Sequence, residues 1–142
     1  REYLEKLAKS LGVREKVRFV GSIVHDELPK YLTSADIYVS TSLSDSGPSN
    51  SLLEAMACGL PAIVTDVGDT RKWIENGRNG FVVPVTDPGI LASKVVHLLH
   101  NKDERDKFGQ LNRQIAEEKA NWQKKMGEIE KLYKGLIERY AL

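Results

Sequence analysis

The sequence predicts an α/β fold of the doubly wound, Rossmann-like kind, built on a parallel sheet. Four short runs rich in Val, Ile, Phe and Tyr each end in turn residues, and stretches of helical periodicity separate them. Because these runs are apolar throughout, we expect helices to cover both faces of the sheet. The predicted strands are 16–22, 36–41, 61–66 and 80–85.

Helical stretches surround these strands. The chain opens with the charged amphipathic stretch 1–12, which stops at Gly12. Asp87 followed by Pro88 is typical of an N-cap and a first helical position, and predicts a helix over 87–101. The last stretch, 121–142, has an apolar stripe at helical spacing, for which we favour packing in the core over a free interface. The stripe consists of Trp122, Met126, Ile129, Tyr133, Leu136 and Tyr140, and the other predicted helices are 26–35, 50–59, 70–77 and 103–120.

Length and composition are those of a single-domain globular protein. The 142 residues suffice for one hydrophobic core, and 21 basic residues balance 20 acidic ones to a net charge of +1. This balance argues against nucleic acid as a partner. The sequence has no apolar run long enough for a membrane span, no secretory signal and one cysteine, Cys58, so we expect a cytoplasmic location.

The order of the predicted elements indicates an incomplete domain. A doubly wound domain ordinarily starts on a strand, whereas this chain starts on a helix. We therefore expect residues 1–142 to form a single domain that lacks its first strands and belongs to a larger protein.

A loop rich in serine and glycine connects strand 36–41 to helix 50–59. In open parallel sheets, ligands bind where strands end and helices begin. A helix N-terminus carries unpaired N–H groups and the positive end of a dipole, which suit an anion such as a phosphate. Gly47 permits a close approach of the backbone to a ligand, and Ser46, Ser49 and Ser51 supply hydroxyls.

One face of helix 50–59 is polar. At about 100° per residue, Asn50, Ser51, Glu54 and Cys58 share this face. A phosphate at the helix start and Glu54 one turn along would be about one ribose apart, and a carboxylate can accept hydrogen bonds from both ribose hydroxyls. A nucleoside diphosphate fits this pattern; the alternative is an ordinary capped helix with a solvated glutamate. The predicted core face holds Leu53, Met56, Ala57 and Leu60.

Longer motifs extend this pattern. Residues 52–68 read LLEAMACGLPAIVTDVG, and they are followed by ENGRNGFVVP at 75–84 and preceded by VRFVGSIV at 17–24. In this order and spacing, the motifs resemble the C-terminal, donor-binding domain of family-4 retaining glycosyltransferases with the GT-B fold, from about residue 3 to Tyr133. The resemblance implies transfer of a hexosyl group from a UDP-, GDP- or ADP-sugar to an acceptor, with retention of anomeric configuration.

The resemblance also implies roles for individual residues. It implies no metal and no other cofactor, because a helix dipole and basic side chains neutralise the leaving diphosphate. The implied contacts are Glu54 with the donor ribose; Asn50, Ser51 and Leu52 with the diphosphate; Asp45, Ser46, Gly47 and Ser49 with the donor sugar; and Ser22, Ile23 and Val24 with the base.

Two positions depart from the family pattern. The family's first glutamate, eight positions before the second and near the anomeric carbon, is Ser46 here, with Asp45 beside it, so no catalytic residue is assigned. Pro48 lacks an N–H that the family often donates to a sugar hydroxyl. Two alternatives therefore stay open: a non-hydrolysing sugar-nucleotide epimerase of the same fold, and a non-catalytic sugar-nucleotide-binding domain.

Several functional parts of the family lie outside 1–142. They include its phosphate-binding arginine and lysine, its acceptor site and its usual catalytic histidine. We therefore expect this chain alone to be inactive, and helix 121–142 to cross to the absent N-terminal domain. That domain would hold the acceptor, which is a glycan, a lipid or a small molecule, and peripheral membrane association of the full protein is compatible with the resemblance.

Other chemically capable residues have plainer interpretations. Cys58 has no evident histidine partner and is expected to be a packed thiol. The three histidines, His25, His97 and His100, lack the spacing of a metal site and are expected to be structural or exposed.

Charged residues follow strand 61–66. Asp66 is expected to cap the next helix. Arg71 and Lys72 could attract a diphosphate, but charged side chains at a helix start are usually solvated.

Overall fold

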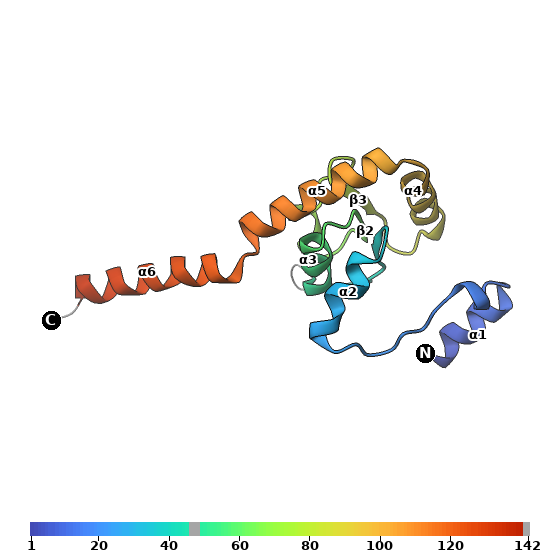
Figure 1. The fold of residues 1–142 in the computed structure, drawn as a ribbon, viewed down its shortest axis with the longest axis horizontal. Coiled ribbons are helices and arrows are strands. Elements are labelled where there is room, and N and C mark those ends of the chain that lie inside the picture. The colour runs from blue at the N-terminus through green and yellow to red at the C-terminus, as the bar shows by residue number, and fades with distance from the viewer. Residues whose placement is uncertain (46–48, 141–142) are drawn as a thin grey trace.

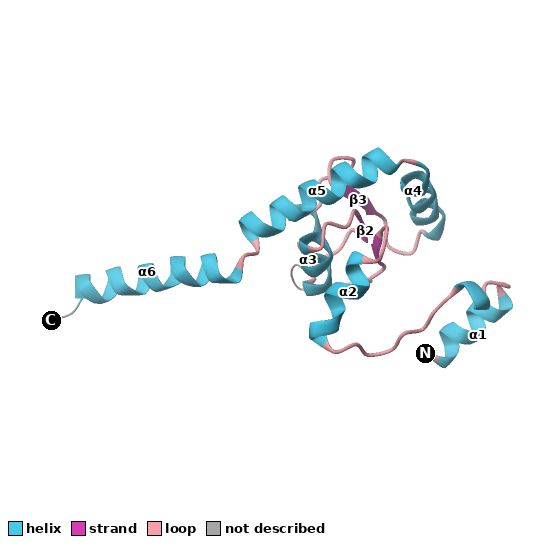
Figure 2. Cartoon of the chain, in the orientation of Figure 1, coloured by secondary structure: helices cyan, strands magenta, loops and turns pink. Residues whose placement is uncertain are grey.

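The computed structural model describes residues 1–45 and 49–140, and in it a three-stranded parallel sheet is covered on both faces by helices (Figures 1 and 2). The strands are β1 (Tyr38–Ser40), β2 (Ala62–Thr65) and β3 (Gly80–Val83), in the order β1-β2-β3. The α/β prediction with a parallel sheet is confirmed. The helices are α1 (Glu2–Ser10), α2 (Leu28–Thr33), α3 (Asn50–Ala57), α4 (Pro88–His100), α5 (Lys102–Lys119) and α6 (Trp122–Tyr140).

One face of the sheet packs against α3 and α5. Ala62 and Val64 point to this face from β2, where they meet Leu52 and Met56 of α3. Ala116 of α5 completes the cluster. The buried side of α3 therefore consists of Leu52, Ala55 and Met56, with Leu60 just beyond the helix.

The predicted core face of this helix was wrong in part. Met56 and Leu60 are buried as predicted, but Leu53 is only half-buried and Ala57 is exposed. The helix is thus turned so that Leu52 packs with Ala62 and Val64 of β2 and Ala55 is buried, because α3 packs between the sheet and α5 and contacts both.

The opposite face of the sheet packs against α4. Ile63 lies between Ala62 and Val64 in β2 and points to the other side, as expected for alternating strand positions. It packs with Phe81 of β3, Leu98 of α4 and Phe108 of α5. Helix α5 therefore contributes to both clusters and joins the two layers.

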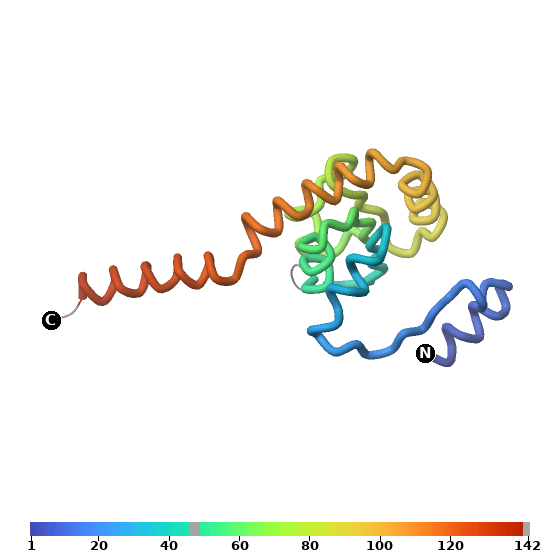
Figure 3. Tube along the Cα trace, viewed as in Figure 1, coloured from blue at the N-terminus to red at the C-terminus, as the bar shows by residue number. Residues whose placement is uncertain are grey.

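The predicted strand 16–22 was wrong. Arg14–Lys16 forms a short 3₁₀ helix, and 17–24 is an extended segment without strand pairing that leads from α1 to α2. A strand exists only through hydrogen bonds to a neighbour, and no described strand runs beside this segment. Figure 3 shows it as a link between α1 and the body of the protein.

The predicted helix 70–77 was also too long. Only Thr70–Lys72 is helical, as a 3₁₀ turn. The chain then turns into β3 because two asparagine side chains take up backbone groups. Asn79 Oδ1 accepts from the Glu75 N–H at 2.7 Å, and Asn76 Oδ1 accepts from the Val82 N–H at 3.1 Å. These side-chain bonds compete with helix continuation.

Helix α6 extends away from the body of the protein (Figure 1). None of its described residues is buried, and Trp122 is 74% exposed. The prediction that its aromatic stripe packs in the core was therefore wrong. No helix in the described part of the chain has both the length and the apolar character needed to cross a lipid bilayer.

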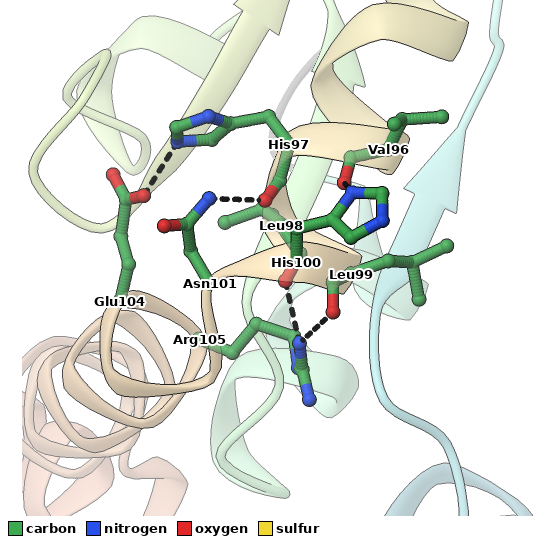
Figure 4. Close-up of polar contacts among 8 residues, drawn as sticks. All are labelled: Val96, His97, Leu98, Leu99, His100, Asn101, Glu104 and Arg105. Atoms are coloured by element: carbon green, nitrogen blue, oxygen red, sulfur yellow. Dashed lines mark hydrogen bonds and ion pairs between the residues drawn. The ribbon is translucent and has the colours of Figure 1, made fainter.

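Side chains brace the corner between α4 and α5 (Figure 4). Arg105 donates to the carbonyl oxygens of Leu98 and Leu99 at the end of α4. His97 contacts the Glu104 carboxylate and packs edge-on against the Phe81 ring. At the other end of α4, the predicted Asp87 cap is confirmed, because its carboxylate accepts from the Ile90 N–H at 2.9 Å.

Candidate functional site

The candidate site lies where the loop after β1 enters α3. Ser49 is the N-cap residue, with extended backbone angles (φ −63°, ψ 125°), and its carbonyl accepts from the N–H groups of Leu52 and Leu53. Asn50 and Ser51, at the first helical positions, are exposed. The Leu52 amide is therefore used within the turn and its side chain is buried. The diphosphate contacts expected of Asn50, Ser51 and Leu52 stay predictions.

A chain of hydroxyls fixes the start of α3. The Tyr38 hydroxyl of β1 lies 2.7 Å from the Ser51 hydroxyl, which in turn lies 2.8 Å from that of Ser49. The Ser49 side chain thus bonds to another side chain and does not cap the helix backbone. Tyr38 was not among the predicted site residues; an aromatic hydroxyl in the strand before the loop was the only signal for it.

Glu54 lies on the partly open side of α3. Its side chain is 34% exposed, one turn from Asn50 and Ser51. It also borders an open hollow of about 320 Å³ between α3 and the end of α5, which includes Glu117. The sequence prediction that Glu54 shares the side of the helix start, away from the core, is therefore compatible with the structure.

The residue that follows the predicted base-binding loop approaches Glu54. In this loop Ser22 and Val24 are exposed and Ile23 is half-buried. The next residue, His25, is 82% exposed and places Nδ1 3.8 Å from Glu54 Oε1. The structure thus brings together two segments that the sequence separates by almost thirty residues. The sequence predicted His25 only to be structural or exposed, because its spacing from His97 and His100 does not fit a metal site.

The predicted sugar contacts are only partly described. Asp45 is exposed and Ser49 is half-buried. Ser46 and Gly47, together with Pro48, lie outside the described residues.

Apolar side chains line a second hollow at the carboxyl ends of the strands. It measures about 260 Å³ and lies between the loops that follow β1 and β3, beside Thr65 at the end of β2. Larger hollows, of about 370 and 420 Å³, lie beside Trp73 on the side of α5. Asn50, Ser51 and Glu54 line none of these three hollows.

Charged residues after β2 pair with one another. Arg71 binds Asp66 through two nitrogens, at 2.8 and 2.7 Å, and Lys72 binds Asp69 at 2.9 Å. The expectation that Asp66 caps the next helix was wrong, because its carboxylate is taken by Arg71. Hydrogen bonding to Arg71 holds the pKa of Asp66 below its ordinary value. Arg71 and Lys72 are exposed, as expected.

Cys58, His97 and His100 lie away from the start of α3 in the contacts that the structure shows. Cys58 is a free thiol of intermediate burial. His100 Nδ1 lies 3.0 Å from the Val96 carbonyl oxygen, and His97 belongs to the α4–α5 corner (Figure 4). Within residues 1–45 and 49–140, no group of three His, Cys, Asp or Glu side chains is arranged to hold a metal ion.

Comparison of the sequence with known proteins gives one family. Residues 1–115 match the family described as Glycosyl transferases group 1. The uncharacterized glycosyltransferase MJ1607 of Methanocaldococcus jannaschii is 34% identical over 139 residues, which are 97% of this chain and 35% of the relative. N-acetyl-alpha-D-glucosaminyl L-malate synthase of Bacillus anthracis is 30% identical over 128 residues, which are 90% of this chain and 33% of that enzyme.

Solved structures share the fold. Sucrose-phosphate synthase from Thermosynechococcus elongatus superposes with a TM-score of 0.89 at 27% identity, over 97% of this chain and 34% of that protein. Anabaena HepE in complex with UDP superposes with a TM-score of 0.88 at 20% identity, over 94% of this chain and 36% of that protein. At that identity the likeness to HepE shows the fold alone. The chain spans about a third of the length of the curated relatives that it matches.

Proposed function

The chain belongs to the group 1 glycosyl transferases, and from this premise we propose that it is the C-terminal, donor-binding domain of a family-4 retaining enzyme with the GT-B fold. Its ligand is a nucleotide sugar, which is a substrate, so the proposal includes no resident cofactor. Transfer of the hexosyl group to an acceptor belongs to the whole protein. The single cysteine, Cys58, fits a reducing compartment, and we propose the cytoplasm.

One observation supports the proposal: Glu54 lies between the start of its own helix, α3, and His25, the residue that follows the loop Ser22–Val24. Glu54 is one helical turn from the exposed Asn50 and Ser51, and the residue after Val24 is within 3.8 Å of the Glu54 carboxylate. This order, from the helix start through Glu54 to His25, supports a diphosphate, a ribose and a base bound one after another, as these groups occur in a nucleoside diphosphate.

Each part of this arrangement has a physical task. The backbone N–H groups and dipole at the start of α3 favour the negative diphosphate and stabilise the charge that develops on it as the sugar leaves. The Ser51 hydroxyl, held by Tyr38, is oriented before the ligand arrives. The Glu54 carboxylate accepts hydrogen bonds from the ribose hydroxyls. These residues bind and orient the donor.

Calorimetry of nucleotide binding tests the proposal. UDP, GDP and ADP are titrated into the full-length protein and into its Glu54→Ala variant. We expect one nucleotide to bind and its affinity to fall by about 1–3 kcal/mol in the variant, because ribose hydroxyls lose their partner. The matched control is Glu117→Ala, which removes a carboxylate bordering the same hollow from α5. Equal affinities for wild type and Glu54→Ala contradict the ribose role.

Product analysis tests the reaction class. With the matching nucleotide sugar and an acceptor, the full-length protein should form a glycoside with the anomeric configuration of the donor, which proton NMR detects. An epimerised nucleotide sugar formed without acceptor would contradict the transferase assignment.

A further inference from the structure

His25 and Glu54 approach each other without a direct hydrogen bond. His25 Nδ1 and Glu54 Oε1 are 3.8 Å apart, whereas a direct N–H···O hydrogen bond requires about 2.7–3.2 Å. Neither side chain has another hydrogen-bond or ion-pair partner among the described residues. The two groups therefore approach each other without closing a bond.

The gap suits one bridging oxygen atom. An oxygen to one side of the line joining these atoms, which are 3.8 Å apart, can be about 2.7 Å from the carboxylate oxygen and about 2.9 Å from the imidazole nitrogen at the same time. Such an oxygen must donate a proton to Glu54 and accept one from His25. A hydroxyl can do both at once, whereas a carbonyl oxygen has no proton to donate.

A direct ion pair explains the approach of His25 to Glu54 less well than a bridging hydroxyl does. His25 is 82% exposed, so a direct pair with Glu54 would be screened by water and would contribute little to stability. The position of His25 at the end of the loop Ser22–Val24 is instead set by the chain itself, because the 3₁₀ turn His25–Glu27 begins there.

We propose that His25 and Glu54 together clamp one ribose hydroxyl of the bound nucleotide, with the hydroxyl donating to Glu54 and accepting from His25 Nδ1–H. This inference rests on the proposed function and extends it with a second residue for the ribose. His25 is a binding residue, and it links recognition of the ribose to the loop assigned to the base.

Substitutions at His25 separate its hydrogen bond from its ring. In the full-length protein, His25→Ala and His25→Phe both remove the nitrogen donor, and His25→Phe keeps an aromatic face. His25→Asn keeps an N–H donor at a place close to Nδ1. We expect affinity for the nucleotide that binds best among UDP, GDP and ADP to fall about 3- to 10-fold in the Ala and Phe variants, the loss of one hydrogen bond. His25→Asn should recover most of it.

Deoxynucleotides test the bridge directly. The 2′-deoxy and 3′-deoxy forms of the same nucleotide are titrated into wild type, His25→Ala and Glu54→Ala. For the form that lacks the bridging hydroxyl, His25→Ala should bind as wild type does, because the partner of His25 is already gone. For the other form the 3- to 10-fold loss should persist. A purely structural role of His25 would lower the affinity for both forms equally.

The outcomes distinguish this inference from the proposed function. If no nucleotide binds the wild type, or if Glu54→Ala has no effect, the proposed function fails and the clamp fails with it. If Glu54→Ala weakens binding but His25→Ala does not, only the clamp is overturned. A loss in His25→Ala that His25→Phe restores also overturns it, because the ring and not the donor would then act.

Discussion

Asn79 and Asn112 hydrogen-bond to each other inside the protein, with Asn79 Nδ2 donating to Asn112 Oδ1 at 2.7 Å. Asn112 Nδ2 donates to the carbonyls of Leu60 and Asn79, at 2.7 and 2.9 Å. Asn79 also donates to the Trp73 carbonyl and accepts from the Glu75 N–H. Both amides are buried and satisfied, so this network ties α5 to the end of α3 and to the turn before β3.

Asn112→Ala should destabilise the fold. The substitution leaves the buried Leu60 and Asn79 carbonyls without their donor, which we expect to lower the free energy of unfolding by about 2–3 kcal/mol. Urea unfolding followed by circular dichroism measures the change. The control is Gln114→Ala on the exposed side of the same helix, expected to stay within about 0.5 kcal/mol. Equal stability of the two variants would show that the network contributes nothing.

Gly109→Ala should separate α5 from α3. A Cβ at Gly109 would overlap the carbonyl oxygen of Gly59, which is backbone and cannot rotate away. We expect a loss of about 1–3 kcal/mol in the free energy of unfolding, typical of overpacking.

Gly127→Ala is the matched control for this prediction. It also replaces a helical glycine, but in α6 a Cβ would meet no atom within 4 Å. It should therefore be neutral or raise stability by about 0.5–1 kcal/mol, because alanine is the better helix former. Opposite signs in urea unfolding are expected, and a destabilised Gly127→Ala would contradict the exposed position of α6.

The sequence predicted those elements whose pattern is local. The apolar runs at β1, β2 and β3 and the Asp87–Pro88 helix start carry their own signals, and the structure contains all of them. The run 16–22 has the same composition but lacks a partner among the described strands, and composition alone does not reveal pairing. The apolar stripe of α6 likewise predicts one face of a helix without saying what covers it.

In the candidate site, too, some features follow from the local sequence pattern and others depend on how the elements pack. The spacing from Asn50 to Glu54 follows from helical geometry and needs no tertiary information. The approach of His25 to Glu54 and the bond from Tyr38 to Ser51 join different elements, so they depend on how α2, β1 and α3 pack. Neither contact leaves a pattern in the sequence.

The Asp66–Arg71 pair should make stability depend on pH in the acid range. Because hydrogen bonding to Arg71 lowers the pKa of Asp66 in the folded state, the pair stabilises the fold above the unfolded-state pKa, roughly 4. Its contribution is lost as pH falls through the lower, folded-state pKa. Melting temperatures of wild type and Asp66→Asn should differ at pH 6 and converge below pH 4. Asp36→Asn, at an exposed aspartate without a described partner, should show no such convergence.

Tyr38→Phe should weaken nucleotide binding more than it weakens the fold. The hydroxyl of Tyr38 holds the Ser51 hydroxyl at 2.7 Å, and its ring packs against the cluster around Leu52. Phenylalanine keeps the ring, so the loss in the free energy of unfolding should stay near 1 kcal/mol or below. Without Tyr38, the Ser51 hydroxyl keeps Ser49 as its one side-chain partner among the described residues, and binding then costs the entropy of orienting it.

Calorimetry on the full-length protein checks this prediction, with a 2- to 5-fold loss of nucleoside diphosphate affinity expected from one imperfectly oriented hydrogen bond. Tyr31→Phe removes an exposed tyrosine hydroxyl that has no described partner, and should change neither affinity nor stability. Ser51→Ala combined with Tyr38→Phe should bind no more weakly than Ser51→Ala alone, because Tyr38 acts through Ser51. Additive losses would mean that Tyr38 contacts the ligand by itself or shapes the site by another route.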